Sequence, residues 1–145
     1  MPTALISELI LKAECTYTVS HTEKTVTIPA ETKLADVKAN ILNEKYTVLT
    51  NDGKEADNNS ATGTGMKIQI LGKDNKVLNE YRIIVLYDAD GNGMIQATDA
   101  RLALRASVSL ENLTDVYFTA ADINNSGNLE ASDARSILRK SVGLE

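Results

Sequence analysis

The stretch 88-DADGNGMIQATD-99 carries oxygen-bearing side chains at alternate positions, with a glycine near its middle and an acid at its end. Residues 122–145 repeat residues 88–111 without a gap, and about half of the aligned positions are identical. A chance acidic turn would not recur together with the segment that follows it. The duplication therefore indicates two metal loops rather than two solvated turns.

The spacing fits calcium, a hard cation that takes about six to eight oxygen ligands. A calcium loop supplies them from positions 1, 3, 5, 7 (its carbonyl), 9 (often through water) and 12, and it turns at a glycine in position 6. Gly93 and Gly127 occupy this turn position. The candidate ligands are Asp88, Asp90, Asn92, Met94, Gln96 and Asp99 in the first loop, and Asp122, Asn124, Ser126, Asn128, Glu130 and Asp133 in the second.

Other metals fit these loops less well. Magnesium takes fewer protein ligands in a stricter octahedron, and zinc prefers the histidine and cysteine that both loops lack. The first loop offers three carboxylates at direct-ligand positions and the second only two. We therefore predict two bound Ca²⁺ ions, with weaker binding at the second loop unless Glu130 coordinates directly.

The elements that must position these loops follow two periods. Residues 1–86 alternate between apolar and polar types and predict a small β module with one short helix, over 33–41, for which Thr32 is a plausible N-cap. Beyond residue 87 the period is helical, and no Pro-rich or Gly/Ser-rich linker separates the halves. We expect the halves to pack as one rigid unit; a flexible joint is the alternative. The strands are predicted over 16–20, 25–29, 46–50, 66–71 and 77–87.

Composition excludes several function classes. A net charge of -5 argues against nucleic acid or an anionic membrane surface as the main partner. No apolar run reaches the roughly 18–20 residues of a membrane span, and we expect no signal peptide in residues 1–12, whose apolar stretch contains an acid. Cys15 is the single cysteine, and His21 is the single histidine, in a predicted turn. No catalytic set can be assembled from these residues, so we do not expect an enzyme.

Two departures from an ordinary EF-hand point to a family. The run YRIIVLY before the first loop favours a strand instead of a helix, and position 12 is Asp instead of Glu. Residues 87–145 thereby resemble a type I dockerin, with two calcium loop–helix (F-hand) motifs joined by a connecting segment. The resemblance implies an all-α domain that binds a cohesin on a scaffoldin in a secreted, cellulosome-type complex and stays monomeric until it does.

The resemblance also implies partner contacts at the loop ends and on the helix faces that follow. Independently of it, Arg101 and Arg135 share a helical stripe with later arginines, and duplicated Arg faces are favoured at interfaces. The alternative is a solvated Arg face, with Leu104 and Leu138 in the core. Many dockerins carry a Ser-Thr-like pair at the loop end and a Lys-Arg pair on the helix. This chain has Ala-Thr or Ala-Ser and Leu-Arg at these places, which leaves open the type of cohesin that it binds. The contacts carried over are Ala97, Thr98, Leu104, Arg105, Ala131, Ser132, Leu138 and Arg139.

The first half is similar to the X-modules, small β modules that precede dockerins in some secreted bacterial proteins. The stretches TIPAETKLADVKANI and ATGTGMKIQIL carry this resemblance. It implies an α+β chain: an Ig-like or X-module-like domain over 1–86 that stabilises a dockerin domain over 87–145. Two other functions remain open, a calcium sensor or buffer without a cohesin partner, and a carbohydrate-binding module with calcium as a structural staple.

Overall fold

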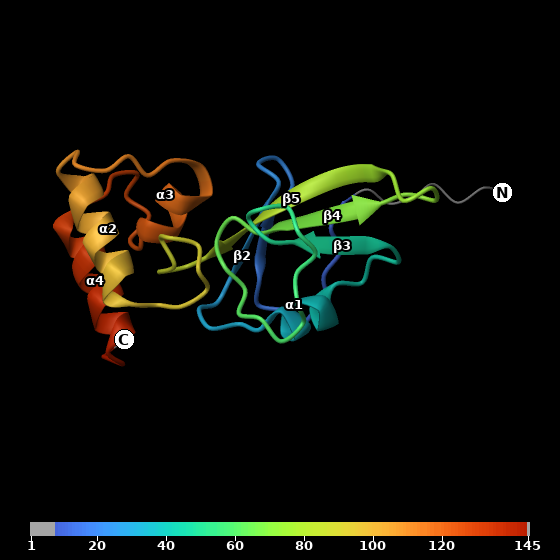
Figure 1. Cartoon of the computed structure of the whole chain (residues 1–145), viewed down its shortest axis with the longest axis horizontal. Helices are drawn as coiled ribbons and strands as arrows, with labels where there is room; N and C mark the ends of the chain where they lie inside the picture. The colour runs from blue at the N-terminus through green and yellow to red at the C-terminus, as the bar shows by residue number, and fades with distance from the viewer. Residues whose placement is uncertain (1–7, 145) are drawn as a thin grey trace.

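The computed structural model describes residues 8–144 (Figure 1). The expectation of no signal peptide in residues 1–12 concerns a segment that lies largely outside the described residues, as does Glu145 at the end of the second repeat. None of the described helices is long and apolar enough to cross a membrane. In chain order the elements are β1 (Thr18–Ser20), β2 (Thr25–Ile28), α1 (Leu34–Asn40), β3 (Tyr46–Leu49), β4 (Lys67–Leu71), β5 (Val77–Val85), α2 (Ala97–Ser107), α3 (Asp115–Ala121) and α4 (Ala131–Ser141).

The five strands form one sheet in the order β1-β2-β5-β4-β3. β2 and β5 pair in parallel, and every other pair is antiparallel. Alternation along β2 and β4 buries one face of the sheet against α1, which contributes Leu34 and Val37 to the core. The strands predicted from the sequence are confirmed, with ends that differ by a few residues.

Two local details differ from or extend the prediction. Thr32 is not the N-cap of α1: Lys33 takes that place, and the Thr32 hydroxyl instead donates a hydrogen bond to the Pro29 carbonyl at 2.7 Å. His21 lies in the turn after β1 as predicted. Its Nδ1 is 2.7 Å from the hydroxyl of Tyr81, whose side chain is fully buried.

The expected fold class, a β domain followed by an all-α domain, is wrong. The chain is a small mixed α/β protein with a five-stranded sheet and four helices among its described residues. The physical reason lies at the end of β5, where Ile83, Ile84 and Val85 are all buried. Ile83 and Val85 face the sheet core, whereas Ile84 packs against Val116 of α3 in a core that both halves share.

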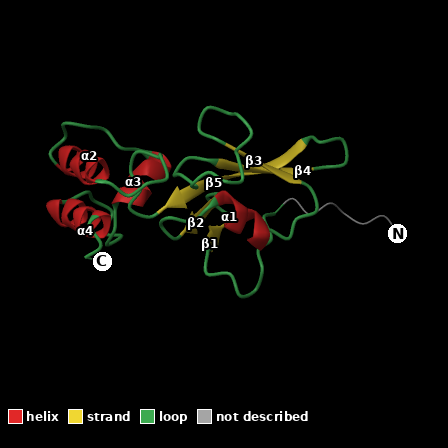
Figure 2. Cartoon of the chain, turned by 60° about the horizontal axis from the view of Figure 1, so that its bottom comes forward, coloured by secondary structure: helices red, strands yellow, loops and turns green. Residues whose placement is uncertain are grey.

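α3 was not predicted as a helix, and its position explains the shared core. It lies between the sheet and the pair formed by α2 and α4 in both views of the chain (Figures 1 and 2). Arg82 of β5 forms an ion pair with Asp115 at the start of α3. α2 and α4 pack against each other, with Ala103 and Ile137 fully buried between them. The two halves therefore pack together, as the missing linker predicted.

Candidate calcium loops

The first loop is held between the end of β5 and the start of α2. Asp88 follows the buried end of the strand, and Asp99 lies in the first turn of the helix. Asp99 Oδ2 accepts a hydrogen bond from the Gln96 backbone N–H at 2.8 Å, and the Gln96 side chain accepts one from the Asp99 backbone N–H. This capping box starts the helix and at the same time fixes the last candidate ligand of the loop.

Carboxylates converge inside the first loop. Carboxylate oxygens of Asp88, Asp90 and Asp99 lie within 4.8 Å of one another. Asp88 Oδ2 accepts hydrogen bonds from the backbone N–H groups of Thr64 and Gly93, each at 2.9 Å. The other oxygen, Oδ1, is buried and has no hydrogen-bond partner within residues 8–144. An ionisable oxygen in this position calls for a cation, because an unpaired buried polar group is costly.

Electrostatics supports the same interpretation. Burial, followed by the nearby Asp90 and Asp99, raises the pKa of Asp88 to about 7, against the hydrogen bonds from Thr64 and Gly93. Burial likewise raises the pKa of Asp99 to about 6. Both side chains have no exposed surface. A bound divalent cation reverses this effect, because its charge favours the ionised form of each carboxylate.

The dimensions fit calcium. Two oxygens that each lie about 2.4 Å from one ion are at most about 4.8 Å apart. The three carboxylates lie within this limit, so each can offer one oxygen to the same ion. Asn92 at position 5 also lies within the loop, where its side-chain nitrogen donates to Gln96 Oε1 at 3.0 Å. Positions 1, 3 and 12 thus bring three carboxylates together, while the side chains of positions 5 and 9 bond to each other in the same loop. Calcium held between the carboxylates would neutralise the buried acids.

The second loop repeats this arrangement between α3 and α4. Asp122 Oδ2 accepts from the Gly127 backbone N–H at 2.9 Å, as Asp88 does from Gly93. Asp133 Oδ2 accepts from the Glu130 backbone N–H at 2.9 Å, in the same capping box. The second loop is therefore flanked by a helix on each side, whereas a strand precedes the first.

The Ser126 hydroxyl lies close to three other candidate ligands of the second loop. It lies 3.0 Å from the Asn128 carbonyl, 3.1 Å from Glu130 Oε1 and 3.4 Å from Asp122 Oδ1. Positions 1, 5, 7 and 9 consequently surround one point, and Glu130 reaches into the loop. Both oxygens of Asp122 have hydrogen-bond partners, unlike those of Asp88.

The candidate partner residues lie on the outer faces of α2 and α4. Leu104 and Leu138 are not core residues: their exposed fractions are 47% and 46%. Arg105 is half-buried, and its Nε donates to Glu111 Oε1 at 3.2 Å. The other candidate partner residues are exposed. Val108 and Val142, which share the apolar helical stripes of these leucines, are exposed as well. Sequence reasoning missed two further exposed apolar residues, Leu110 and Leu144.

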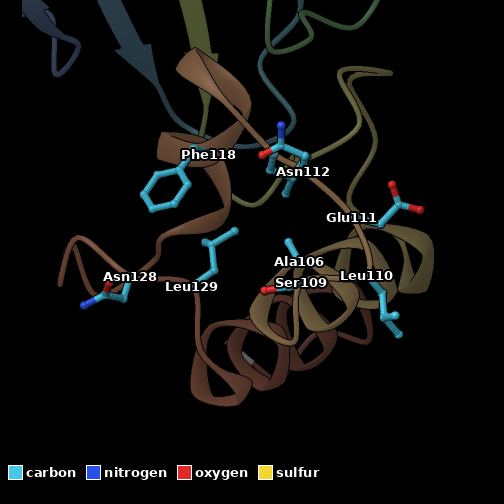
Figure 3. Close-up of a pocket in the computed structure, with 9 residues that line it drawn as sticks. Ala106, Ser109, Leu110, Glu111, Asn112, Phe118, Asn128 and Leu129 are labelled. Atoms are coloured by element: carbon cyan, nitrogen blue, oxygen red, sulfur yellow. The ribbon is translucent and has the colours of Figure 1, made fainter.

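A groove of about 680 Å³ lies beside the second loop (Figure 3). Phe118 and Leu129 lie close together along it, and the segment after α2 forms its other side. None of the candidate partner residues lines it, although the candidate metal ligand Asn128 does. The groove therefore lies apart from the candidate partner residues themselves, although the exposed Leu110 lines it.

One contact of the first loop could not be read from the repeat. Thr64, which belongs to the β-rich half, donates its backbone N–H to Asp88. The only sequence signal for it is the run of small residues in 61-ATGTG-65, a composition that allows two backbones to approach closely. Comparisons of the chain with protein-family models, curated proteins and solved structures found no match.

Proposed function

We propose that this chain is a calcium-dependent docking module that binds a cohesin on a scaffoldin and so assembles an extracellular, cellulosome-type complex. The observation that carries the proposal is the duplication: two loops of matching geometry each lead into an eleven-residue helix with the same exposed side chains. The module performs no chemistry of its own in this proposal. Its β-rich half supports the helical half.

Calcium is supported by the unpaired, fully buried oxygen of Asp88 and by the converging carboxylates around it. The ions would be held by the two sets of ligands named above, one set in each loop. Each ion would neutralise acids that otherwise repel one another at the start of α2 or α4. Docking is then calcium-dependent because the loops present the helices that bear the docking surfaces.

Exposed apolar side chains support the proposal that α2 and α4 carry the docking surfaces. Leu104 is followed by Val108 at the C-cap of α2, which is 61% exposed, and Leu138 is followed by Val142 at the C-cap of α4, which is 64% exposed. Aliphatic side chains beside arginines are the composition of protein interfaces, and adjacent exposed apolar groups are uncommon on a surface without a partner. Each surface also includes small polar residues at the loop end, Thr98 in one repeat and Ser132 in the other.

Because the two surfaces match, we expect the module to dock in either of two orientations related by about 180°, according to the pseudo-twofold symmetry of the repeat. The test uses two double variants, Arg101→Ala with Arg105→Ala and Arg135→Ala with Arg139→Ala. Each should retain binding, since the other surface still docks. Complete loss of binding from only one of them would establish a single orientation instead.

The function is tested by capture on a panel of cohesins, with and without chelator. Nanomolar capture that requires calcium supports the proposal. Calcium binding without capture by any cohesin would contradict it and favour a calcium sensor or buffer. Retention on polysaccharide would favour carbohydrate binding, although none of the five tyrosines is exposed to form a sugar platform.

A further inference from the structure

The first loop contacts the β-rich half closely at Gly63 and Thr64. These two residues and Gly65 are called here the 63–65 loop. Thr64 is fully buried, and its backbone N–H donates to Asp88 Oδ2 at 2.9 Å. Its hydroxyl donates to the Val85 carbonyl at 3.1 Å and accepts from the Val85 N–H at 3.0 Å. One threonine therefore joins the end of β5 to the first ligand position of the calcium loop.

The backbones approach so closely that only glycine fits between them. A Cβ on Gly63 would collide with the Gly91 carbonyl oxygen and would lie 3.1 Å from the Gly93 nitrogen. A Cβ on Gly91 would lie 2.6 Å from the Thr64 carbonyl oxygen. The exposed side chain of Asn51 reinforces the contact, because its nitrogen donates to that same carbonyl at 3.0 Å.

The second loop has no such support. A Cβ on Gly127, the counterpart of Gly93, would meet nothing within 4 Å. The hydrogen bonds to Asp122 come from Ser126 and Gly127 of its own loop. The loops thus share their turn and capping box, but within residues 8–144 a hydrogen bond from the β-rich half reaches the first aspartate of the first loop and not that of the second.

We infer that the 63–65 loop positions Asp88 for calcium, so that the first loop is preorganised by the β-rich half and binds calcium more tightly than the second. This inference rests on the calcium binding of the proposed function. The Thr64 N–H holds one oxygen of Asp88 and leaves the other, unpaired one for the ion. Hydrogen bonds that orient a ligand in this way set metal affinity. By linkage, calcium in the first loop also stabilises the contact between the two halves.

The test compares two buried threonines in the full-length chain. Thr64→Val removes the hydroxyl that binds Val85, and Thr62→Val removes a buried hydroxyl that has no hydrogen-bond partner within residues 8–144. Calorimetric titration with calcium reports the first loop alone in an Asp122→Ala background and the second alone in an Asp88→Ala background. Thr64→Val should weaken the first loop by about tenfold and leave the second unchanged. Thr62→Val should change neither.

Asn51→Ala is the second variant, since an exposed residue can be removed without unfolding the core. It should weaken the first loop by a few-fold, in the same direction as Thr64→Val. Equal weakening of both loops, or no weakening of the first, would overturn the inference and leave calcium binding intact. If the unmodified loops bind no calcium in either background, the proposed function fails and the inference fails with it.

Discussion

The first candidate calcium loop follows a buried strand and lies against the β-rich half, whereas the second follows the short helix α3 and faces solvent on the corresponding side. Asp88 has no exposed surface and one unpaired oxygen, while Asp122 is 6% exposed and has partners for both oxygens. The loops nevertheless share their turn and their capping box. The comparison shows that a repeat can conserve ligand geometry while its surroundings decide how well each copy is supported.

Calcium removal should have the largest effect. A ligand at about 100 times its dissociation constant adds about 2.7 kcal/mol per site, so two ions should add about 5 kcal/mol. Chelator should therefore unfold residues 87–144 and leave the sheet core folded. Hydrogen exchange followed by residue would show this, with the amides of the second loop released before those of the first. Equal release of both loops would break the comparison.

Removal of one metal ligand should have the next largest effect and should distinguish the two loops. Asp88→Ala and Asp122→Ala should each reduce the calcium stoichiometry by one and forfeit about 2.7 kcal/mol at the same calcium excess. Asp88→Ala should also speed exchange of the Thr64 amide, which loses its acceptor, whereas Asp122→Ala should not. Exchange at Thr64 that is the same in both variants would mean that the two halves are uncoupled.

Gly93→Ala and Gly127→Ala, at the turns of the two loops, form a matched pair of variants. Gly93 and Gly127 have φ values of 84° and 88°, so a side chain should cost about 1–2 kcal/mol at either position. At Gly93 the added carbon would also lie 2.9 Å from Ala61 Cβ, with no equivalent at Gly127. Gly93→Ala should thus be the more destabilising, as measured by urea denaturation in calcium. A larger loss from Gly127→Ala would contradict the comparison.

Tyr117→Phe should have the smallest effect. The Tyr117 hydroxyl donates to Asn51 at 3.0 Å and so supports the contact between the halves. Its loss should lower the free energy of unfolding by about 1 kcal/mol. Tyr46→Phe is the control, because its hydroxyl donates to the Lys38 carbonyl, away from the loops. Only Tyr117→Phe should weaken calcium binding at the first loop, and an identical effect of Tyr46→Phe would argue for a general loss of stability.

The strands, α1, α2 and α4 could be predicted from the sequence because their signals are local. Period-two alternation marks the strands, and the helical period of the apolar residues marks α2 and α4. α3 is as short as α1, but it escaped prediction because it gains its stability from packing on β5, which the local sequence does not show. The interpretation of Leu104 and Leu138 stayed open for a related reason. Helical spacing defines a stripe, but the position of the neighbouring helix decides whether the stripe is buried.

By itself, the sequence determined the ligand spacing and the duplication, because a calcium loop takes its ligands from twelve consecutive residues. Only the tertiary structure decided which copy is supported from outside. Thr64 reaches Asp88 because β4 pairs with β5, which places the segment before β4 beside the end of β5. No repeating pattern in the sequence predicts the close approach of Thr64 to Asp88. It depends on the register of two strands and on glycines small enough to let the backbones meet.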